Sequence, residues 1–490
     1  MQIAVNNLSF AYPGRSDPVF SKASFSFDTS WKLGLIGRNG RGKTTLLKIL
    51  SGELEGYGGS ITGNASFEYF PYPVDNEALS LSCLDALRRS GCEAEEWELI
   101  WEFSLIGLRG SALENPYSSL SLGEQAKALL CALFLKSGSF MLIDEPTNHL
   151  DLQSREHVGK YLASKEGFIL ASHDRSLLDS SVDHILSINK TTIELQKGNF
   201  GSWQQNRENM DNYDIALNKA LKSEIKRLEA ASRQTAGWAG VVESRRYGSG
   251  LDRGYVGHKS AKMMKRSKVV QKRQANAIAQ KESLLKDVEQ NQSLLMFPLR
   301  FHSDLLISAN EAGMNYSGTA GVQKTSFEIR RDERLAVIGS NGSGKSTILK
   351  LACGILQPSE GRISIAKNLK ISYVPQGTSH LKGTLSEWAA AQAIDLTVFL
   401  TNLDKLGVNN LSLAIELEGL SEGEKKKALI AASLSTSAHL YIWDEPLNYL
   451  DIYTRIQIEN AILAAEPAML VVEHDKEFIE SIATSSLSLS

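Results

Sequence analysis

The chain has 490 residues, of which 42% are hydrophobic and 22% charged, and its formal net charge is −3. This length predicts two to three domains, and the composition is that of a soluble globular protein. No apolar run approaches the roughly 20 residues that a helix needs to cross a bilayer, which excludes a membrane-spanning protein.

Residues 1–5 read directly as a strand, without the charged and apolar regions of a signal peptide. The cysteines are scattered along the chain and show neither metal-ligand nor disulfide spacing; they are Cys83, Cys92, Cys131 and Cys353. We therefore expect a cytoplasmic, reduced protein.

Two stretches of the chain show the same alternation of strand and helix patterns. In the first, strands are predicted at 3–10, 20–27, 32–36, 140–143 and 168–170, with a helix at 44–50. In the second, strands are predicted at 334–338, 440–443 and 469–472, with a helix at 346–352. Short buried strands alternating with helices favour an α/β fold with a mostly parallel sheet in each stretch. The expected domains are a first repeat (1–202), a linker (203–297) and a second repeat (298–490).

Each repeat contains a glycine-rich phosphate-binding loop between its strand and its helix. Residues 37–44 (GRNGRGKT) and 339–346 (GSNGSGKS) both match G-x-x-x-x-G-K-[ST]. Backbone N–H groups of such a loop wrap phosphates, the lysine adds a cation, and the Ser or Thr hydroxyl contacts Mg²⁺. The predicted ATP contacts are Gly37, Asn39, Gly40, Gly42, Lys43, Thr44 and Thr45, and Gly339, Asn341, Gly342, Gly344, Lys345, Ser346 and Thr347.

Paired acids follow the next buried strand of each repeat. Asp144 and Asp444 stand where a second Mg²⁺ contact is needed, beside Thr44 and Ser346. The neighbouring glutamates, Glu145 and Glu445, are the predicted catalytic groups that orient or deprotonate the attacking water. His173 and His474 follow these glutamates by 28 and 29 residues and are predicted to bind the γ-phosphate and that water. Corresponding motif residues of the two repeats lie 300 to 302 positions apart, so the chain is predicted to be a tandem ATPase.

The linker differs in pattern and charge from both repeats. Helix signals cover about 203–242 and 258–292, and the glycine-rich stretch 243–257 predicts the turn of an α-helical hairpin. Residues 233–273 hold eleven Lys or Arg against two acids, which gives +9. A solvated helical face is one interpretation; RNA binding, with rings stacking on bases, is the other. The predicted RNA contacts are Arg245, Arg246, Tyr247, Arg253, Tyr255, His258, Lys259, Lys262, Lys265 and Arg266.

A further motif connects the repeats to a known family. Residues 120–124 (LSLGE) and 420–424 (LSEGE) resemble the LSGGQ signature of ATP-binding-cassette ATPases. The resemblance implies that Ser121 and Gly123 complete the Lys345 site, while Ser421 and Gly423 complete the Lys43 site, in a head-to-tail sandwich within one monomer. It also places Asp151 and Asp451 in loops that cross this interface, and Tyr12 and Tyr316 where the family stacks adenine.

The two sites depart from the family pattern in different ways. Gln376 is the expected glutamine that contacts Mg²⁺ and water in the second repeat, but Tyr72 stands at the matching position of the first. Leu122 and Glu422 replace the first glycine of each signature. We therefore expect unequal sites, with slower turnover at Lys43.

Longer strings make the resemblance more specific. They are 35–43 (LIGRNGRGK), 142–151 (LIDEPTNHLD), 264–268 (MKRSK) and 440–451 (LYIWDEPLNYLD). With two cassettes joined by a helical linker, the whole chain is similar to the ABC-F family of translation factors, in its Lsa-type antibiotic-resistance branch. The resemblance implies binding to the 70S ribosome E site, contact with 23S rRNA and P-site tRNA, and displacement of lincosamides, pleuromutilins and streptogramin A drugs, with ATP hydrolysis driving release.

Two alternatives remain open. One is a housekeeping translation or ribosome-assembly factor of the same family. The other is the ATPase subunit of a transporter with separate membrane partners, for which a +9 arm would have no use. No groove-reading motif for duplex DNA is visible, and we expect neither a DNA nor a membrane partner.

Overall fold

The computed structural model describes residues 1–14, 17–136, 138–148, 150–189, 192–244, 269, 272–273, 293–316, 319–408 and 415–489. The chain divides into two compact units. One unit contains Met1–Trp203 together with Asn291–Ser490, and the other is Gln204–Gln290. Both repeats therefore belong to one compact unit.

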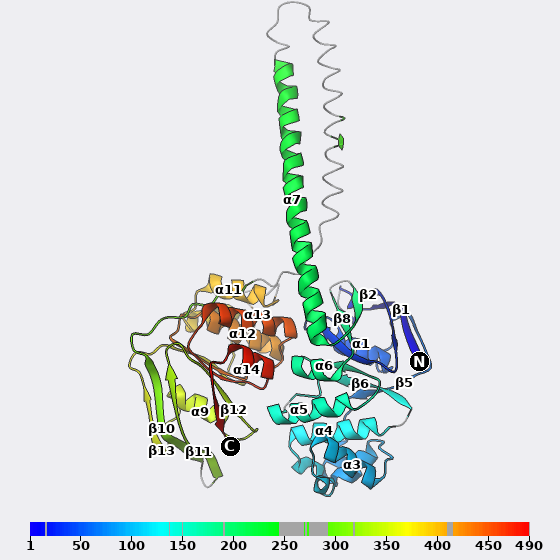
Figure 1. Cartoon of the computed structure of the whole chain (residues 1–490), viewed down its shortest axis with the longest axis vertical. Helices are drawn as coiled ribbons and strands as arrows, with labels where there is room; N and C mark the ends of the chain where they lie inside the picture. Colours follow the sequence, from blue (N-terminus) through cyan, green and yellow to red (C-terminus); the bar gives the residue numbers. More distant parts are fainter. Residues whose placement is uncertain are drawn as a thin grey trace, which may run out of the picture. The chain divides into compact units, whose positions relative to one another are not determined.

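The first repeat contains an antiparallel sheet and a larger, mainly parallel sheet (Figure 1). The antiparallel sheet has the order β2 (Phe20–Asp28), β1 (Gln2–Phe10), β4 (Gly58–Thr62). The parallel sheet has the order β5 (Ser66–Phe70), β6 (Ser139–Asp144), β7 (Phe168–Ala171), β3 (Lys32–Gly37), β8 (His184–Ile188), with β9 (Ile193–Lys197) antiparallel at its edge. Crossovers between parallel strands bring the carboxyl ends of β3, β6 and β7 to one edge, where the glycine loop and the acids lie.

The second repeat has the same two sheets. The antiparallel sheet has the order β11 (Thr319–Arg330), β10 (Leu305–Tyr316), β13 (Glu360–Ile365). The parallel sheet has the order β14 (Ile371–Val374), β15 (Leu440–Asp444), β16 (Met469–Val472), β12 (Arg334–Gly339), β17 (Ser485–Leu489). The predicted α/β fold with parallel sheets in two tandem repeats is confirmed.

Helices cover these sheets in both repeats. Those of the first are α1 (Lys43–Leu50), α2 (Cys83–Arg89), α3 (Glu96–Ile106), α4 (Leu122–Phe134), α5 (Leu152–Ala163) and α6 (Arg175–Ser181), with short 3₁₀ turns at Asn76–Ser80, Gly110–Leu113 and Tyr117–Ser119. Those of the second are α9 (Lys345–Ala352), α10 (Leu385–Ala391), α11 (Leu396–Lys405), α12 (Glu422–Ser435), α13 (Ile452–Ala465) and α14 (Lys476–Ile482), with a 3₁₀ turn at Leu417–Gly419.

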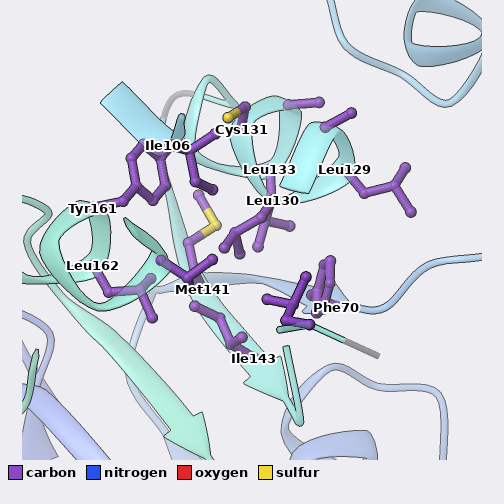
Figure 2. Close-up of a cluster of buried hydrophobic side chains, with 14 of the residues drawn as sticks. Phe70, Ile106, Leu129, Leu130, Cys131, Leu133, Met141, Ile143, Tyr161 and Leu162 are labelled. Carbon is purple, nitrogen blue, oxygen red and sulfur yellow. The ribbon is translucent and has the colours of Figure 1, made fainter. Parts of the chain in front are cut away.

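In the core of the first repeat, the signature helix α4, which begins at Ser121, packs against strand β6. Figure 2 shows Leu130 and Leu133 of α4 beside Met141 and Ile143 of β6, with Tyr161 of α5 also in the cluster. All are buried, and each such side chain contributes about 2 kcal/mol through burial. Because α4 begins at the signature and β6 ends at the acids, this packing fixes two predicted site elements relative to each other.

The linker begins with one long helix, α7 (Phe200–Ser244), which has 45 residues (Figure 1). It agrees with the helix predicted for about 203–242, but it also includes Glu243 and Ser244, the first two residues of the predicted turn. The rest of the predicted turn, most of the second helix and all predicted RNA contacts lie outside the described residues. Within the described part of the chain, no helix is both long and apolar enough to cross a membrane.

Candidate nucleotide sites

The first glycine loop joins the end of β3 to the start of α1. Gly42 has φ 95°, and a Cβ there would lie 2.4 Å from Val19 Cγ1, so the position requires glycine. Lys43 opens the helix and its Nζ donates to the Gly37 carbonyl at 2.8 Å. Burial lowers the pKa of Lys43, while nearby carboxylates oppose that shift. A buried amine at a helix N-terminus matches the needs of a polyphosphate anion.

The second loop repeats this geometry between β12 and α9. Gly344 has φ 88°, and Lys345 Nζ donates at 2.9 Å to the carbonyls of both Gly339 and Ser340. Burial lowers the pKa of Lys345 as well. Gly37 and Gly339 are thus the last residues of their strands and act here through their carbonyls.

Each loop opens onto a cavity, of about 400 Å³ in the first repeat and about 820 Å³ in the second. The predicted residues that line the first are Tyr12, Asn39, Gly40, Gly42, Lys43, Thr44, Thr45, Asp144, Glu145 and His173. Those that line the second are Asn341, Gly342, Gly344, Lys345, Ser346, Thr347, Gln376, Glu445 and His474. The fold therefore brings most of the predicted nucleotide residues together.

The predicted magnesium residues pair across neighbouring strands. Thr44 Oγ1 donates to Asp144 Oδ2 at 2.7 Å, and the Tyr69 hydroxyl donates to the same oxygen at 3.1 Å. In the second repeat burial raises the pKa of Asp444, and a hydrogen bond from Ser346 lowers it. Asp444 Oδ1 is buried and has no hydrogen-bond partner. A hydroxyl and an orphaned carboxylate oxygen suit Mg²⁺, which prefers oxygen ligands, so these residues fit the ion.

The two catalytic candidates occupy matching backbone positions but differ electrostatically. Glu145 and Glu445 have φ of 50° and 45°, a left-handed conformation that is strained for glutamate. Burial raises the pKa of Glu145 to about 7, against the opposing charge of Lys43. Burial also acts on Glu445, but contacts with His474 and Gln376 outweigh it and lower the pKa to about 2.

The histidines lie where the sequence predicted them. His173 Nε2 is 3.5 Å from Glu145 Oε1, and His474 Nε2 is 3.6 Å from Glu445 Oε1. Burial lowers the pKa of His173 well below its usual value, so this ring is neutral. Asn448 Nδ2 also donates to Glu445 Oε2 at 2.7 Å.

Gln376 and Tyr72 differ in location as well as in chemistry. Gln376 lines the second cavity and hydrogen-bonds Glu445. Tyr72 packs against the core of the first repeat, and its hydroxyl donates to the Leu129 carbonyl at 3.3 Å. Tyr72 is not among the described residues that line the first cavity.

The signature residues begin α4 and α12 as capping boxes. Ser121 Oγ accepts from Glu124 N at 3.3 Å while Glu124 Oε2 accepts from Ser121 N at 2.9 Å. Ser421 and Glu424 repeat these bonds at 3.3 and 3.0 Å. The glutamate in place of the family's glutamine therefore fixes each signature serine at a helix N-terminus.

The first glycine loop meets the second repeat directly. Asn39 N donates to Asp451 Oδ2 at 3.2 Å, and Asn39 Nδ2 donates to the Tyr449 carbonyl at 2.7 Å. A Cβ added to Gly423 would lie 3.7 Å from Asn39 Nδ2. This is the head-to-tail arrangement expected for the Lys43 site.

At the second glycine loop, Asp151 of the first repeat makes the contact that corresponds to that of Asp451. A backbone hydrogen bond from Asn341 helps to lower the pKa of Asp151. The expected contact of Ser121 and Gly123 with this loop stays a prediction.

Sequence reasoning missed an arginine cluster between the repeats. Arg175 Nη2 is 2.9 Å from Glu459 Oε2 and its Nε is 3.1 Å from Glu477 Oε2, with Asp475 also in contact. Arg455 Nη1 bonds Asp475 Oδ2 at 3.0 Å. The matched positions of Arg155 and Arg455, 300 residues apart, were the signal that could have found part of this cluster.

Of the two residues predicted to stack on adenine, the structure describes the side chain of Tyr12 alone. Tyr12 lines the first cavity and its hydroxyl lies 3.0 Å from Thr45 Oγ1, with its ring edge-on to Phe10. The side chain of Tyr316 lies outside the described residues.

Two glycine loops, each with a carboxylate pair, a histidine and a signature helix, define a tandem ATP-binding-cassette protein. The family model described as "ABC transporter" matches residues 20–148 and 322–448, which together exceed half of the chain. The chain therefore belongs to this family and carries two of its ATP-binding domains, which are ATPase domains in general.

Similar proteins are known over nearly the full length. The ribosome protection protein VmlR of Bacillus subtilis is 26% identical over 507 residues, covering 100% of this chain and 87% of VmlR. The energy-dependent translational throttle protein EttA of Mycobacterium tuberculosis is 25% identical over 530 residues, covering 96% and 88%. The crystal structure of archaeal ribosome recycling factor aABCE1 with stalk protein aP1 matches with TM-score 0.66 at 20% identity, covering 98% and 87%, and supports the fold alone.

Proposed function

We propose that the chain is a Mg²⁺-dependent ATPase in which nucleotide binding and contact between the two repeats are coupled. The observation that carries this proposal is the pair of bonds from Asn39 to Asp451 and to the Tyr449 carbonyl. A phosphate in the Lys43 loop would lie between its own repeat and the signature residues of the other. ATP that bridges both surfaces stabilises the closed state by its differential contacts.

The chain's own residues divide the chemical work. Lys43 and Lys345, with the loop N–H groups, hold the β- and γ-phosphates. Mg²⁺, when bound through Thr44 and Asp144 or through Ser346 and Asp444, supplies charge neutralisation. Glu145 and Glu445 orient or deprotonate water, and the neighbouring histidines hold the γ-phosphate end of the site.

We propose that the ATPase cycle controls binding of the chain to the bacterial 70S ribosome and its release. EttA is named a translational throttle and VmlR a ribosome protection protein, and both align with nearly the whole chain. The +9 segment at residues 233–273 supports contact with RNA, since Lys and Arg neutralise phosphates. The finer proposal is an Lsa-type ABC-F protein that binds the E site and displaces peptidyl-transferase-centre drugs, with the linker near 23S rRNA and P-site tRNA.

The test is drug susceptibility in a sensitive Gram-positive host. The intact chain, a Glu145→Gln/Glu445→Gln double variant and a variant lacking residues 243–257 are expressed at matched levels. We expect only the intact chain to raise the inhibitory concentration of lincomycin or tiamulin. A variant in which Lys262, Lys265 and Arg266 become Gln tests charge without shortening the linker.

The other outcomes identify the alternatives. If the intact, expressed chain leaves susceptibility unchanged, the resistance proposal is wrong. Slowed growth from the double variant alone, with ribosomes co-sedimenting, identifies a housekeeping factor. If the chain does not bind ribosomes and the variant lacking residues 243–257 keeps full ATPase activity, a transporter subunit is favoured.

A further inference from the structure

The loop that carries Gln376 is tied to the signature helix of its own repeat. Lys426 lies on α12, five positions after Ser421, and its side chain is 1% exposed. Its Nζ donates to the carbonyls of Pro375 and Gln376, both at 3.1 Å, and of Asp444 at 3.3 Å. An ammonium group has three N–H donors, and all are used on backbone carbonyls.

These acceptors belong to two elements of the second nucleotide site. One is the loop that follows β14 and presents Gln376 to Glu445. The other is the end of β15, where Asp444 precedes Glu445. A single buried cation therefore holds both elements at a fixed distance, and the carboxylates of Asp444, Glu445 and Glu473 lie close enough to offset its charge.

A second hydrogen bond joins the same face of α12 to the loop that carries Gln376. Glu422, one turn before Lys426, accepts from the hydroxyl of Thr378, two residues after Gln376. Residues i and i+4 of a helix share a face, so both side chains reach the same loop.

The first repeat has neither side chain. The matching positions are Leu122, which is 63% exposed, and Ala126, which packs against the apolar core. Tyr72 there is held by that core and by its bond to Leu129. The second repeat therefore has both the glutamine and the two side chains, Lys426 and Glu422, that bond its loop. The first repeat has neither.

We propose that Lys426, assisted by Glu422, is a positioning residue that holds Gln376 against Glu445, so that the second nucleotide site is the faster one. This inference rests on the proposed ATPase function. Lys426 touches neither nucleotide nor water in this role and acts through the loop backbone.

The experiment isolates each site in turn. Lys426→Met is combined with Glu145→Gln, which leaves the second site active, and separately with Glu445→Gln, which leaves the first. In the first background we expect kcat to fall about tenfold or more with KM for ATP unchanged within about twofold. In the second background we expect turnover to stay within about twofold, since Tyr72 replaces the glutamine there. Lys382→Met, at an exposed lysine of the same repeat, is the matched control.

A second readout needs no nucleotide. Amide hydrogen exchange of a peptide covering residues 371–381 is expected to accelerate in Lys426→Met, while a peptide covering 66–76 stays unchanged. The double variant Glu422→Leu/Lys426→Ala copies residues with which the matching helix of the first repeat already folds, and we expect the same effects from it.

Two results overturn the proposal. Equal losses in both backgrounds mean that the change disturbs α12, which also carries Ser421 and Gly423 toward the first site. Unchanged kcat and unchanged exchange mean that the loop does not depend on Lys426. If the parent chain hydrolyses no ATP, the proposed function fails, while the exchange measurement still decides whether Lys426 holds the loop.

Discussion

The two nucleotide sites share their motifs but differ in what surrounds the catalytic carboxylate. Both side chains are half-buried, but desolvation raises the pKa of Glu145 to about 7, whereas hydrogen bonds from His474, Gln376 and Asn448 lower the pKa of Glu445 to about 2. The two glycine loops make similar lysine contacts, and both glutamates have a left-handed backbone conformation. Duplicated motifs thus guarantee a similar binding geometry, while the helices and loops packed behind them set the reactivity of each site.

A similar inequality holds at the contact between the repeats. Arg175 makes a buried cluster with acids of α13 and α14. The matching residue of the second repeat, Lys476, makes one exposed pair with Glu156 at 3.3 Å. The following changes test these differences, from the largest expected effect to the smallest.

Glu445→Gln is expected to reduce turnover at the second site by about 100-fold or more, because the water loses its base. Glu145→Gln is expected to lower total turnover by about twofold at most, since the first site contributes little. Phosphate release at saturating Mg·ATP checks both. Equal losses from the two changes would contradict the inequality of the sites.

Arg175→Met is expected to destabilise the chain by about 3 kcal/mol, because it leaves buried carboxylates without their counter-charge. Lys476→Met removes an exposed pair and is expected to cost about 0.5 kcal/mol or less. Thermal unfolding of both variants gives the comparison. Similar melting temperatures for the two would show that the Arg175 cluster is not a main contact.

Gln376→Ala is expected to slow the second site by about tenfold, since Glu445 loses one of the contacts that orient it. Tyr72→Ala is the matched change in the first repeat, where we expect packing to weaken without a specific loss of turnover. Single-turnover hydrolysis in site-isolated backgrounds separates these effects. A loss at the first site with unchanged stability would place Tyr72 in the chemistry after all.

The smallest effect concerns pH. The pKa of Glu477 is raised to about 7, mainly by burial. The positive charge of Arg175 opposes this shift, and the negative charge of Asp475 adds to it. A carboxyl whose pKa is raised on folding stabilises the folded state below the unfolded value, and this contribution is lost as pH rises from about 4.5 to about 7. Glu477→Gln is therefore expected to gain stability relative to the parent at pH 8 but not at pH 5. Because Glu477 is 37% exposed, solvent screening limits the difference to about 1 kcal/mol. Melting curves at the two pH values test it, and a constant difference would contradict the shift.

Much of the fold followed from local patterns. The strand before each glycine loop, the helix after it and the buried strands ending at Asp144 and Asp444 are short apolar runs, which have few alternatives in an α/β chain. The first helix of the linker was also predicted, because residues 203–242 favour helix and lack strand signals.

The candidate sites were predicted only in part. Loop lysines, acids and histidines carry fixed spacing, so each could be assigned before its neighbours were known. Lys426 and Arg175 could not, because a lysine or arginine on a helix surface looks like any solvated charge until its partners are placed.

The amino-acid sequence by itself determined two phosphate loops, their acids and a charged helical linker, since these depend on residues close together in the chain. Only the tertiary structure decided that Asn39 meets Asp451 and that Tyr72 turns into the core while Gln376 faces Glu445. Those contacts join residues that packing brings together from distant parts of the chain. Their energies depend on burial and on partners that no local pattern encodes.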